Sequence, residues 1–242
     1  MPPSVELSTL DEERFGIRSA KAKKVTGENL PEILDFCRQH RVKFLIARCL
    51  ANDFTAIHAM EQSGFLLMDT LVYMGRNISK IPLPTDQPSA LIRKMASGEE
   101  PAVVKIARES FKGYFGHYHA DPRLNPQTST EAYISWAERS CYDPEVANCV
   151  LVAEVEKQLV GFLTVRLITP QQGELVLGGV LPDAQGHGVY KSYIIKGMEW
   201  CKEQGADEVI TSTQIINIAV QKVWARLGFE IREAYYTFHK WF

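Results

Sequence analysis

The turn at residues 180–190 is the part of this chain whose residue types and spacing best suit a phosphorylated ligand. It reads Val-Leu-Pro-Asp-Ala-Gln-Gly-His-Gly-Val-Tyr and lies between an apolar run and an amphipathic pattern. Glycine lets the backbone approach a ligand closely, and the free amides and dipole of a following helix N-terminus favour a diphosphate. The turn lacks the Gly-Lys-Ser/Thr of a P-loop and the spacing of a dinucleotide fingerprint.

A loop rich in aromatic residues and histidine, residues 114–122, is the second segment that could do chemistry. His117, His119 and Asp121 alternate in it, and histidine titrates near neutral pH, so it could take a proton from an amine directly or through water. Alternate spacing is weak evidence for a metal site, and none is expected. We expect the aromatic rings and Arg123 to bind a second ligand by stacking and by phosphate contacts, although an aromatic plug between two domains is the alternative. The candidate substrate-binding residues here are Phe111, Tyr114, Tyr118, His119, Asp121 and Arg123.

The predicted secondary structure places both segments in a mixed α/β fold. Before residue 81, strands are expected at 17–25, 42–49 and 65–74, and helices at 30–40 and 55–62. After residue 88, strands are expected at 91–95, 149–156, 159–167, 174–180, 208–213 and 229–241, and helices at 101–111, 130–141, 190–201 and 218–227. Three prolines between them exclude a regular element. We therefore expect an N-terminal α/β domain (1–80), a proline-rich linker (81–88) and a larger domain (89–242).

Composition excludes several classes of protein. The chain has 242 residues, a formal net charge of −2 and 45% hydrophobic residues. It is too apolar for disorder, and it has no global basic field for nucleic acid. No apolar run approaches the roughly 20 residues of a membrane helix, and the first residues do not resemble a signal peptide, so a cytoplasmic protein is expected. The five cysteines are scattered without a Cys-x-x-Cys pair, and we expect reduced thiols.

A weak internal repeat and the last strand bear on the architecture. Residues 52–65 and 217–229 both read as a polar cap, a short helix, Gly-Phe and a strand. Either any helix that ends in glycine gives this pattern, or the N-terminal unit is a truncated copy of the C-terminal one. The apolar segment 235–241 is expected to be a core strand, or a strand that is exchanged or paired at an edge between two copies in a homodimer.

The turn resembles the acyl-CoA loop of the GNAT superfamily of N-acetyltransferases, which reads Gln/Arg-x-x-Gly-x-Gly/Ala after a strand ending in a Val-x-Pro-like turn. Gln185 and Gly188 match, whereas Tyr190 stands where the family has a small residue. A second family signature is Asn-x-x-Ala-x-x-x-Tyr-x-x-x-Gly-Phe. The corresponding residues here are Asn217, Val220, Trp224, Gly228 and Phe229.

The resemblance covers about 150 residues, because the order of elements after residue 89 also matches. It implies a GNAT fold with a smaller N-terminal α/β domain similar to a truncated GNAT unit, acyl-CoA as co-substrate, and no metal. In family members two parallel strands diverge, and the pantetheine arm pairs with the freed backbone. The residues assigned to CoA in this way are Val180, Gln185, Gly186, His187, Gly188, Val189, Tyr190, Asn217 and Trp224. Asn217 is also a candidate helix cap.

Within the superfamily, the chain is more similar to nucleotide-sugar N-acyltransferases, the group that includes TDP-fucosamine acetyltransferases. These share an N-terminal α/β unit and a Thr-Gln before the motif asparagine, here Thr213-Gln214. The resemblance implies acetyl or short hydroxyacyl transfer, for example of 3-hydroxybutanoyl, to the amine of a dTDP-linked amino-dideoxy sugar for bacterial surface polysaccharide. It makes Gln214 a substrate-binding candidate. A peptide, protein or antibiotic acceptor, and a catalytically silent CoA-binding module, remain alternatives.

Proton transfer is where the sequence departs from the family. The family's tyrosine acid is replaced by Trp224, and an indole cannot act as an acid near neutral pH. The thiolate would leave unassisted, or Tyr190, Tyr114 or Cys141 would protonate it. Glu174 is the expected base, because related histone acetyltransferases place a glutamate there; a solvated strand-end carboxylate is the alternative. Strand alternation predicts that Glu174 shares one face with Val176, Gly178 and Val180. His117 is the rival base.

Overall fold

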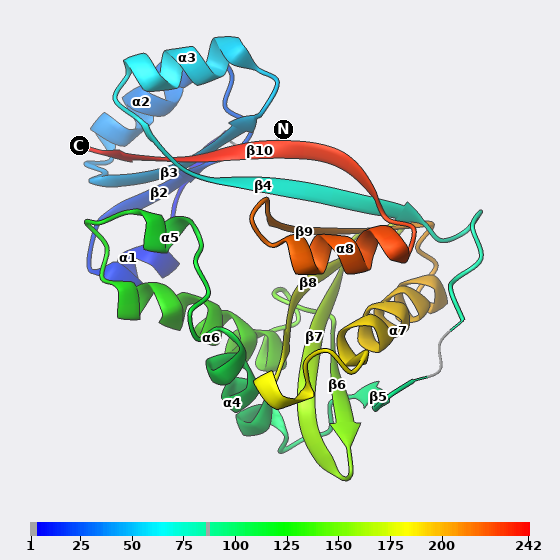
Figure 1. Ribbon diagram of the computed structural model, residues 1–242. Coiled ribbons are helices and arrows are strands. Elements are labelled where there is room, and N and C mark those ends of the chain that lie inside the picture. Colours follow the sequence, from blue (N-terminus) through cyan, green and yellow to red (C-terminus); the bar gives the residue numbers. More distant parts are fainter. Residues whose placement is uncertain (1–3, 86–87) are drawn as a thin grey trace.

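The structure is a computed structural model that describes residues 4–85 and 88–242. These residues contain one ten-stranded mixed sheet in the order β1-β2-β3-β10-β4-β9-β8-β7-β6-β5. Figure 1 shows strands from both ends of the chain in this sheet, with β10 (red) and β4 (cyan) side by side at its centre. The expectation of a mixed α/β fold is confirmed. Met1, Pro2, Pro3 and two residues of the expected linker, Asp86 and Gln87, lie outside the described residues.

The N-terminal part alternates strands and helices, as expected. Its elements are β1 (Val5–Leu7), α1 (Thr9–Phe15), β2 (Ser19–Ala22), α2 (Leu30–Gln39), β3 (Phe44–Leu50), α3 (Phe54–Gln62) and β4 (Leu66–Asn77). The first two were not predicted. Helix α1 ends at Gly16, whose positive φ of 66° lets its amide bond the Glu12 carbonyl.

The remaining elements also follow the predicted order. They are β5 (Leu91–Lys94), α4 (Glu100–Ser110), α5 (His117–Ala120), α6 (Pro126–Tyr142), β6 (Cys149–Val155), β7 (Gln158–Thr169), β8 (Gln172–Val180), a 3-10 turn (Pro182–Ala184), α7 (Val189–Glu203), β9 (Glu208–Gln214), α8 (Ile218–Arg226) and β10 (Glu230–Trp241). Helix α6 begins four residues before its predicted start, because the Asn125 side chain accepts hydrogen bonds from the amides of Gln127 and Thr128.

The two halves repeat one architecture and exchange their last strands. Strands β2 and β3 are parallel and linked through α2, as β8 and β9 are through α7; α3 and α8 follow. The final strand of each half then pairs with the other half: β10 with β3, and β4 with β9. The exchanged strands also pair with each other. This order supports the interpretation of the weak sequence repeat as a copied architecture.

The strand exchange affects two expectations from the sequence, the division into two domains and the role of segment 235–241. The segment 81–85 contains no helix or strand, but strands on its two sides belong to one sheet, so the division into two domains stays a prediction. Segment 235–241 is a core strand, and its use as a free edge in a homodimer was a wrong prediction, because β3 and β4 pair with its two edges.

The helices divide between the two faces of the sheet. Phe238 on β10 packs into the core formed with α2 and α3. Trp241, on the alternate face of the same strand, packs with residues of α4 and α6. On β4, Val72 and Met74 join the core under α7 and α8. One face therefore carries α2, α3, α7 and α8, and the other carries α1, α4, α5 and α6 (Figure 1).

Among the helices that the structure describes, none combines the length and apolar composition needed to cross a bilayer.

Candidate functional site

Strands β8 and β9 pair at one end only. Their parallel register runs from Gln172–Glu208 to Leu175–Thr211 and stops there. The far edge of β8 stays paired with β7 as far as Val180, and the far edge of β9 with β4 as far as Gln214. We call residues 176–180 of β8 and 212–214 of β9 the open segment. The carbonyls of Val180 and Gln214 accept hydrogen bonds from within the chain, and the other facing backbone groups are free to pair with an extended ligand.

The glycine turn lies directly beyond the open segment. Gly186 and Gly188 have positive φ values of 80° and 84°, and residues 185–188 are exposed. A Cβ at Gly186 would meet nothing within 4 Å, so the backbone is open to a ligand there. Helix α7 begins at Val189 with no acidic residue in its first turn. The Gln185 side chain donates to the Val180 carbonyl (3.1 Å), which fixes the turn against β8.

A β-bulge in β8 changes which side chains share a face. The register with β7 shifts between Leu177 and Leu175, so Val176 is the extra residue. Before the bulge, Glu174 alternates with Leu175, which faces α7. After it, Gly178 lies against Tyr193 of α7. The predicted shared face was therefore wrong: Glu174 points away from α7, whereas Gly178 and Val180 point toward it.

Glu174 is buried and forms an ion pair. Arg166 on β7 donates to its Oε2 from Nε (2.7 Å) and from a second guanidinium nitrogen (2.6 Å). Glu174 pairs with Ile210, four residues before Gln214, so it lies at the closed end of the strand pair. At about 3.3 Å per residue, that is ~13 Å from the end of β9. Its assignment as the base stays a prediction.

Two buried polar atoms on α7 and α8 make no hydrogen bond in favourable geometry among the described residues: the Tyr193 hydroxyl and the Trp224 indole nitrogen, the second of which lies beside the Tyr190 side chain. The Tyr193 hydroxyl would be 3.0 Å from a Cβ at Gly178. Burial raises the pKa of Tyr190 and Tyr193, so both phenols stay protonated at neutral pH. Asn217 precedes α8, but its side chain donates to Thr213 (3.0 Å) and makes no cap hydrogen bond to α8.

These features fit an acyl-CoA ligand. The open segment offers a strand edge, the glycine turn offers an exposed backbone, and the unpartnered Tyr193 hydroxyl lies against the open segment at Gly178. The structure thus brings together the residues predicted for CoA on β8, the turn, α7 and α8. Within the described ranges, no group of three or more His, Cys, Asp and Glu side chains is placed to bind a metal ion.

On the other face, the loop between α4 and α5 covers the end of β9. The Tyr114 hydroxyl donates to the Gln214 side-chain oxygen, and Tyr133 packs edge-on against Tyr114 with ring centroids 4.8 Å apart. Gly116 passes so close that a Cβ there would clash with the Tyr133 hydroxyl. The predicted substrate residues Tyr114 and Gln214 therefore meet. Asp69 of β4, which the sequence analysis missed, lies beside Gln214.

A second missed residue, His239 of β10, joins two predicted ones. Its Nδ1 is 2.8 Å from an Asp121 oxygen and its Nε2 is 2.9 Å from Nδ1 of His117. Burial lowers the pKa of His117 and of His239, so both rings are neutral at pH 7. With a carboxylate accepting from His239 Nδ1–H, His239 Nε2 must accept from His117. This hydrogen bonding leaves Nε2 of His117 as an acceptor.

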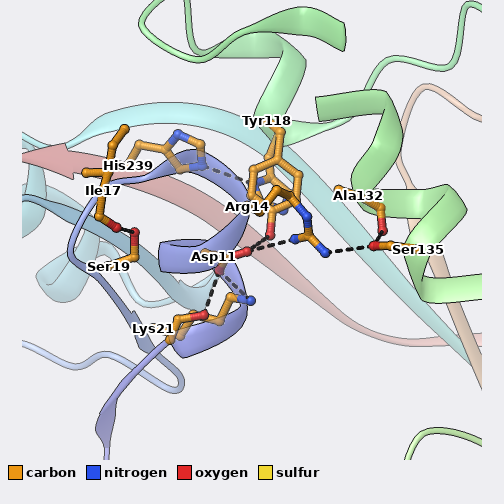
Figure 2. A network of polar contacts seen from close by, with 11 residues as sticks. Asp11, Arg14, Ile17, Ser19, Lys21, Tyr118, Ala132, Ser135 and His239 are labelled. Atoms are coloured by element: carbon orange, nitrogen blue, oxygen red, sulfur yellow. Dashed lines mark hydrogen bonds and ion pairs between the residues drawn. The ribbon is translucent and has the colours of Figure 1, made fainter. Parts of the chain in front are cut away.

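The aromatic loop is also tied to the N-terminal helix. The Tyr118 hydroxyl donates to Asp11 (2.9 Å), which also binds Lys21 (2.6 Å) and Arg14 (2.9 Å); Figure 2 shows these contacts. Arg14 reaches on to Ser135 of α6. Burial raises the pKa of Asp11, but Lys21 and the hydrogen bonds outweigh it, so the net shift is downward. For Tyr118, this is the plug arrangement that the sequence left open.

The remaining candidates lie further out. His119 bonds Thr130 (3.1 Å) and stacks on Tyr133. Arg123 is exposed, with its guanidinium 5.4 Å from the Trp241 ring centroid. Phe111 is buried against Tyr133. Cys141 lies near Met95 and Val150 at the β5–β6 edge, beyond β7 from the open segment, and burial raises its pKa to about 11.

A hollow of about 400 Å³ lies between α2 and α3, on the face opposite α5 and α6. None of the residues predicted for donor or acceptor lines it.

Solved structures share this fold. A GCN5-related N-acetyltransferase from Sphaerobacter thermophilus aligns with a TM-score of 0.66 at 17% identity, covering 98% of this chain and 76% of that one. A tandem GNAT protein from the clavulanic acid biosynthesis pathway aligns with a TM-score of 0.64 at 13% identity, covering 93% and 76%. At these identities the likeness shows the fold alone.

Curated relatives match in sequence. A mycothiol acetyltransferase of Saccharopolyspora erythraea is 27% identical over 179 residues, covering 72% of this chain and 55% of the relative. The spore coat polysaccharide biosynthesis protein SpsD of Bacillus subtilis is 23% identical over 203 residues, covering 82% and 66%. The chain thus spans between about half and two thirds of the length of these relatives. The model of the acetyltransferase (GNAT) family, whose acyl donor is acyl-CoA, matches residues 104–229, more than half of the chain. This chain therefore belongs to the acetyltransferase (GNAT) family.

Proposed function

We propose that this protein transfers an acetyl or short hydroxyacyl group, such as 3-hydroxybutanoyl, from acyl-CoA to the amine of a dTDP-linked amino-dideoxy sugar. The product would serve bacterial surface polysaccharide. The open segment carries this proposal, because it lies between a turn suited to phosphate on one side and the polar patch at Tyr114 and Gln214 on the other. A donor held there presents its thioester to an acceptor on the face of α5.

Each part of the donor site has a role in the proposal. The amides of residues 186–190 hold the diphosphate, and the free edge of β8 pairs with the pantetheine arm. A backbone amide on the unpaired edge of residues 176–180 stabilises the oxyanion in this proposal. Tyr193 and Trp224 supply the two unpartnered donors. Acyl-CoA supplies an activated thioester, so the protein has to position it and manage protons.

Proton donation to the leaving sulfur is assigned to Tyr190 or to no group. Trp224 packs near the donor and transfers no proton. Cys141 is separated from the open segment by β7, so its position makes it the least suited of the predicted candidates.

The sugar acceptor is supported by two observations. The relative SpsD is named for spore coat polysaccharide biosynthesis and aligns over most of this chain. Arg123 is exposed beside Trp241, an arrangement that suits the diphosphate and base of a nucleotide sugar.

Thiol release tests the proposal. The assay combines the protein with acetyl-CoA or 3-hydroxybutanoyl-CoA and one amine: dTDP-4-amino-4,6-dideoxygalactose, its 3-amino isomer, kanamycin or a tetrapeptide. We expect rapid thiol release with one of the dTDP sugars only, and an N-acyl sugar by mass spectrometry. Release with kanamycin or the peptide alone favours another acceptor. CoA binding without release from any amine rejects transfer.

A further inference from the structure

Asp69 is the one acidic residue of strand β4, which is apolar over most of its length, and it lies outside both family signatures. Strand β4 reads Leu-Leu-Met-Asp-Thr-Leu-Val-Tyr-Met-Gly-Arg-Asn. One carboxyl oxygen, Oδ1, accepts a hydrogen bond from the Thr70 amide (2.6 Å). The other, Oδ2, is buried and has no partner in hydrogen-bond geometry among the described residues, although the Gln214 side chain lies close enough to lower the pKa of Asp69. A buried carboxylate oxygen without a partner costs folding free energy, so its persistence points to a donor that arrives with a ligand.

The sheet register places Asp69 at the acceptor side of the open segment. Leu71, two residues further along β4, pairs with Gln214 at the end of β9. Asp69 shares its face with Leu71 and lies just beyond that end, opposite Thr237 of β10. Helix α5 contacts β4 on this face. Asp69 therefore lies beside Gln214 and near Tyr114, the two acceptor residues that the structure brings together.

The negative charge of Asp69 has no cation bonded directly to it among the described residues. Arg48 of β3 is the cation that acts on it, but the Arg48 Nε donates to Thr237 (3.2 Å). Burial raises the pKa of Asp69 to about 6, although the Thr70 amide, Arg48 and Gln214 oppose this shift. At neutral pH the group is a carboxylate that takes up a proton readily.

We propose that Asp69 binds the ammonium group of the acceptor and takes its proton. The inference rests on the proposed function. One N–H bond of the ammonium breaks and its proton moves to Oδ2. The neutral nitrogen then attacks the thioester carbonyl, a C–N bond forms and the C–S bond breaks. The thiolate leaves with the bonding electron pair, and the remaining excess proton goes from nitrogen to the thiolate or to water.

The test compares three variants with the wild type: Asp69→Asn, Glu174→Gln and Asp35→Asn. Asp35 is an exposed carboxylate on α2 that pairs with Arg38, so its variant is a matched control for the loss of an aspartate charge. The readouts are thiol release from acetyl-CoA with the amine panel above across pH 5–8, CoA affinity by calorimetry, and thermal unfolding of the free protein across pH 4–8.

We expect Asp69→Asn to lower kcat/KM by roughly 10²–10⁴-fold while CoA affinity is unchanged. The wild-type rate rises with pH through about 6 as Asp69 loses its proton, and this rise is absent from the variant. Its melting temperature equals the wild-type value at pH 4 and exceeds it at pH 7. The sign follows because a raised aspartate pKa makes the wild type lose stability between about pH 4 and pH 6, where the native state holds the extra proton.

Several outcomes overturn the assignment of Asp69 alone. One is wild-type transfer with the pH rise retained in Asp69→Asn. Another is loss of that rise in Glu174→Gln only, which gives the role to Glu174. A third is a lower melting temperature of Asp69→Asn with a matching loss of CoA affinity, which makes Asp69 structural. If the wild type itself releases thiol with none of the amines, the proposed function fails first and the assignment falls with it.

Discussion

The two halves of the sheet contain the same kind of parallel strand pair, and only one pair is open. In the C-terminal half, four residues of β8 pair with β9 and the last five do not. In the N-terminal half, all four residues of β2 pair with β3, and the chain after β2 continues the pairing through the Val25 amide and the Arg48 carbonyl (2.9 Å). Of these two parallel pairs, the second alone offers a ligand a free strand edge between its strands.

The turns before α7 and α2, the helices that link the two strand pairs, also differ: the turn before α7 is open to solvent and the turn before α2 is packed. Before α7, the glycines are exposed. Before α2, a Cβ at Gly27 would lie 2.9 Å from the Thr55 methyl group of α3, so the turn is packed. Thr26 and Asn29 bond each other, Pro31 removes an amide from the first turn, and Glu32 adds a negative charge. The same architecture therefore keeps the donor site in one half, while the other half supplies β4 and α1 to the acceptor face.

We call the N-terminal half, in which β2 and β3 pair throughout, the closed half, and the C-terminal half the open half. The largest effect is expected for Asp11, whose ion pairs and hydrogen bond hold the closed half against α5. Asp11→Asn removes a fully buried charge and leaves Lys21 and Arg14 without their partner. We expect a loss of about 3–5 kcal/mol in the free energy of unfolding. Urea denaturation at pH 7 measures it, with Asp35→Asn as the control.

The same change has a pH signature. The lowered pKa of Asp11 means that its contribution is present above the unfolded-state pKa near 3.8 and is lost as pH falls through the lower folded-state value. The difference between wild type and Asp11→Asn should shrink in acid. A difference that is constant down to pH 2 would show that the ion pairs are not its source.

A smaller effect is expected from substitutions in the turns before α7 and α2, where the measured quantity is the affinity for CoA. Gly188→Val puts a β-branched residue at a φ of 84°, which costs about 1–3 kcal/mol. We expect CoA to bind roughly 5–150-fold more weakly, by calorimetry. Gly27→Ala is the counterpart in the closed turn, and it should alter stability but not CoA affinity. Equal losses of affinity in both variants would contradict the distinction between an open and a closed half.

The smallest effect concerns an unpartnered donor. Tyr193→Phe removes a buried hydroxyl that has no partner in the free protein. We expect the free variant to be equal to the wild type in stability, or more stable by up to about 1 kcal/mol. The variant should gain less melting temperature from saturating CoA than the wild type does. An identical CoA-induced shift in both proteins would remove Tyr193 from the donor site.

Local patterns in the sequence predicted the elements well, and long-range pairing was not predicted. The apolar spacing of residues 30–40 gave α2, and the alternation at 149–167 gave the β6–β7 hairpin. The exchange of β4 and β10 depends on contacts between residues more than 130 positions apart, which no local period encodes. The bulge at Val176 was missed because simple alternation assumes an uninterrupted ladder.

The donor side of the site was more predictable than the acceptor side. The glycine turn is contiguous, so its residues and its backbone role can be recognised together. The acceptor side combines Tyr114, Gln214, Asp69 and His239 from four separate segments. In the sequence, Asp69 stands out as a charged residue in a largely apolar strand, and His239 as a histidine in the last strand. Neither residue can be assigned to the site until the sheet register shows which residues lie beside it.

The exchanged strands also constrain how this chain can be made and cut. About 150 residues separate the end of β4 at Asn77 from the start of β10 at Glu230. At 5–20 residues per second, a nascent chain holds β3 and β4 without their shared partner for roughly 10–30 s. Once β10 is inserted, the last strand of each half is paired with strands of the other half. A protease that cuts near residue 85 would leave two fragments that cannot part without breaking the sheet.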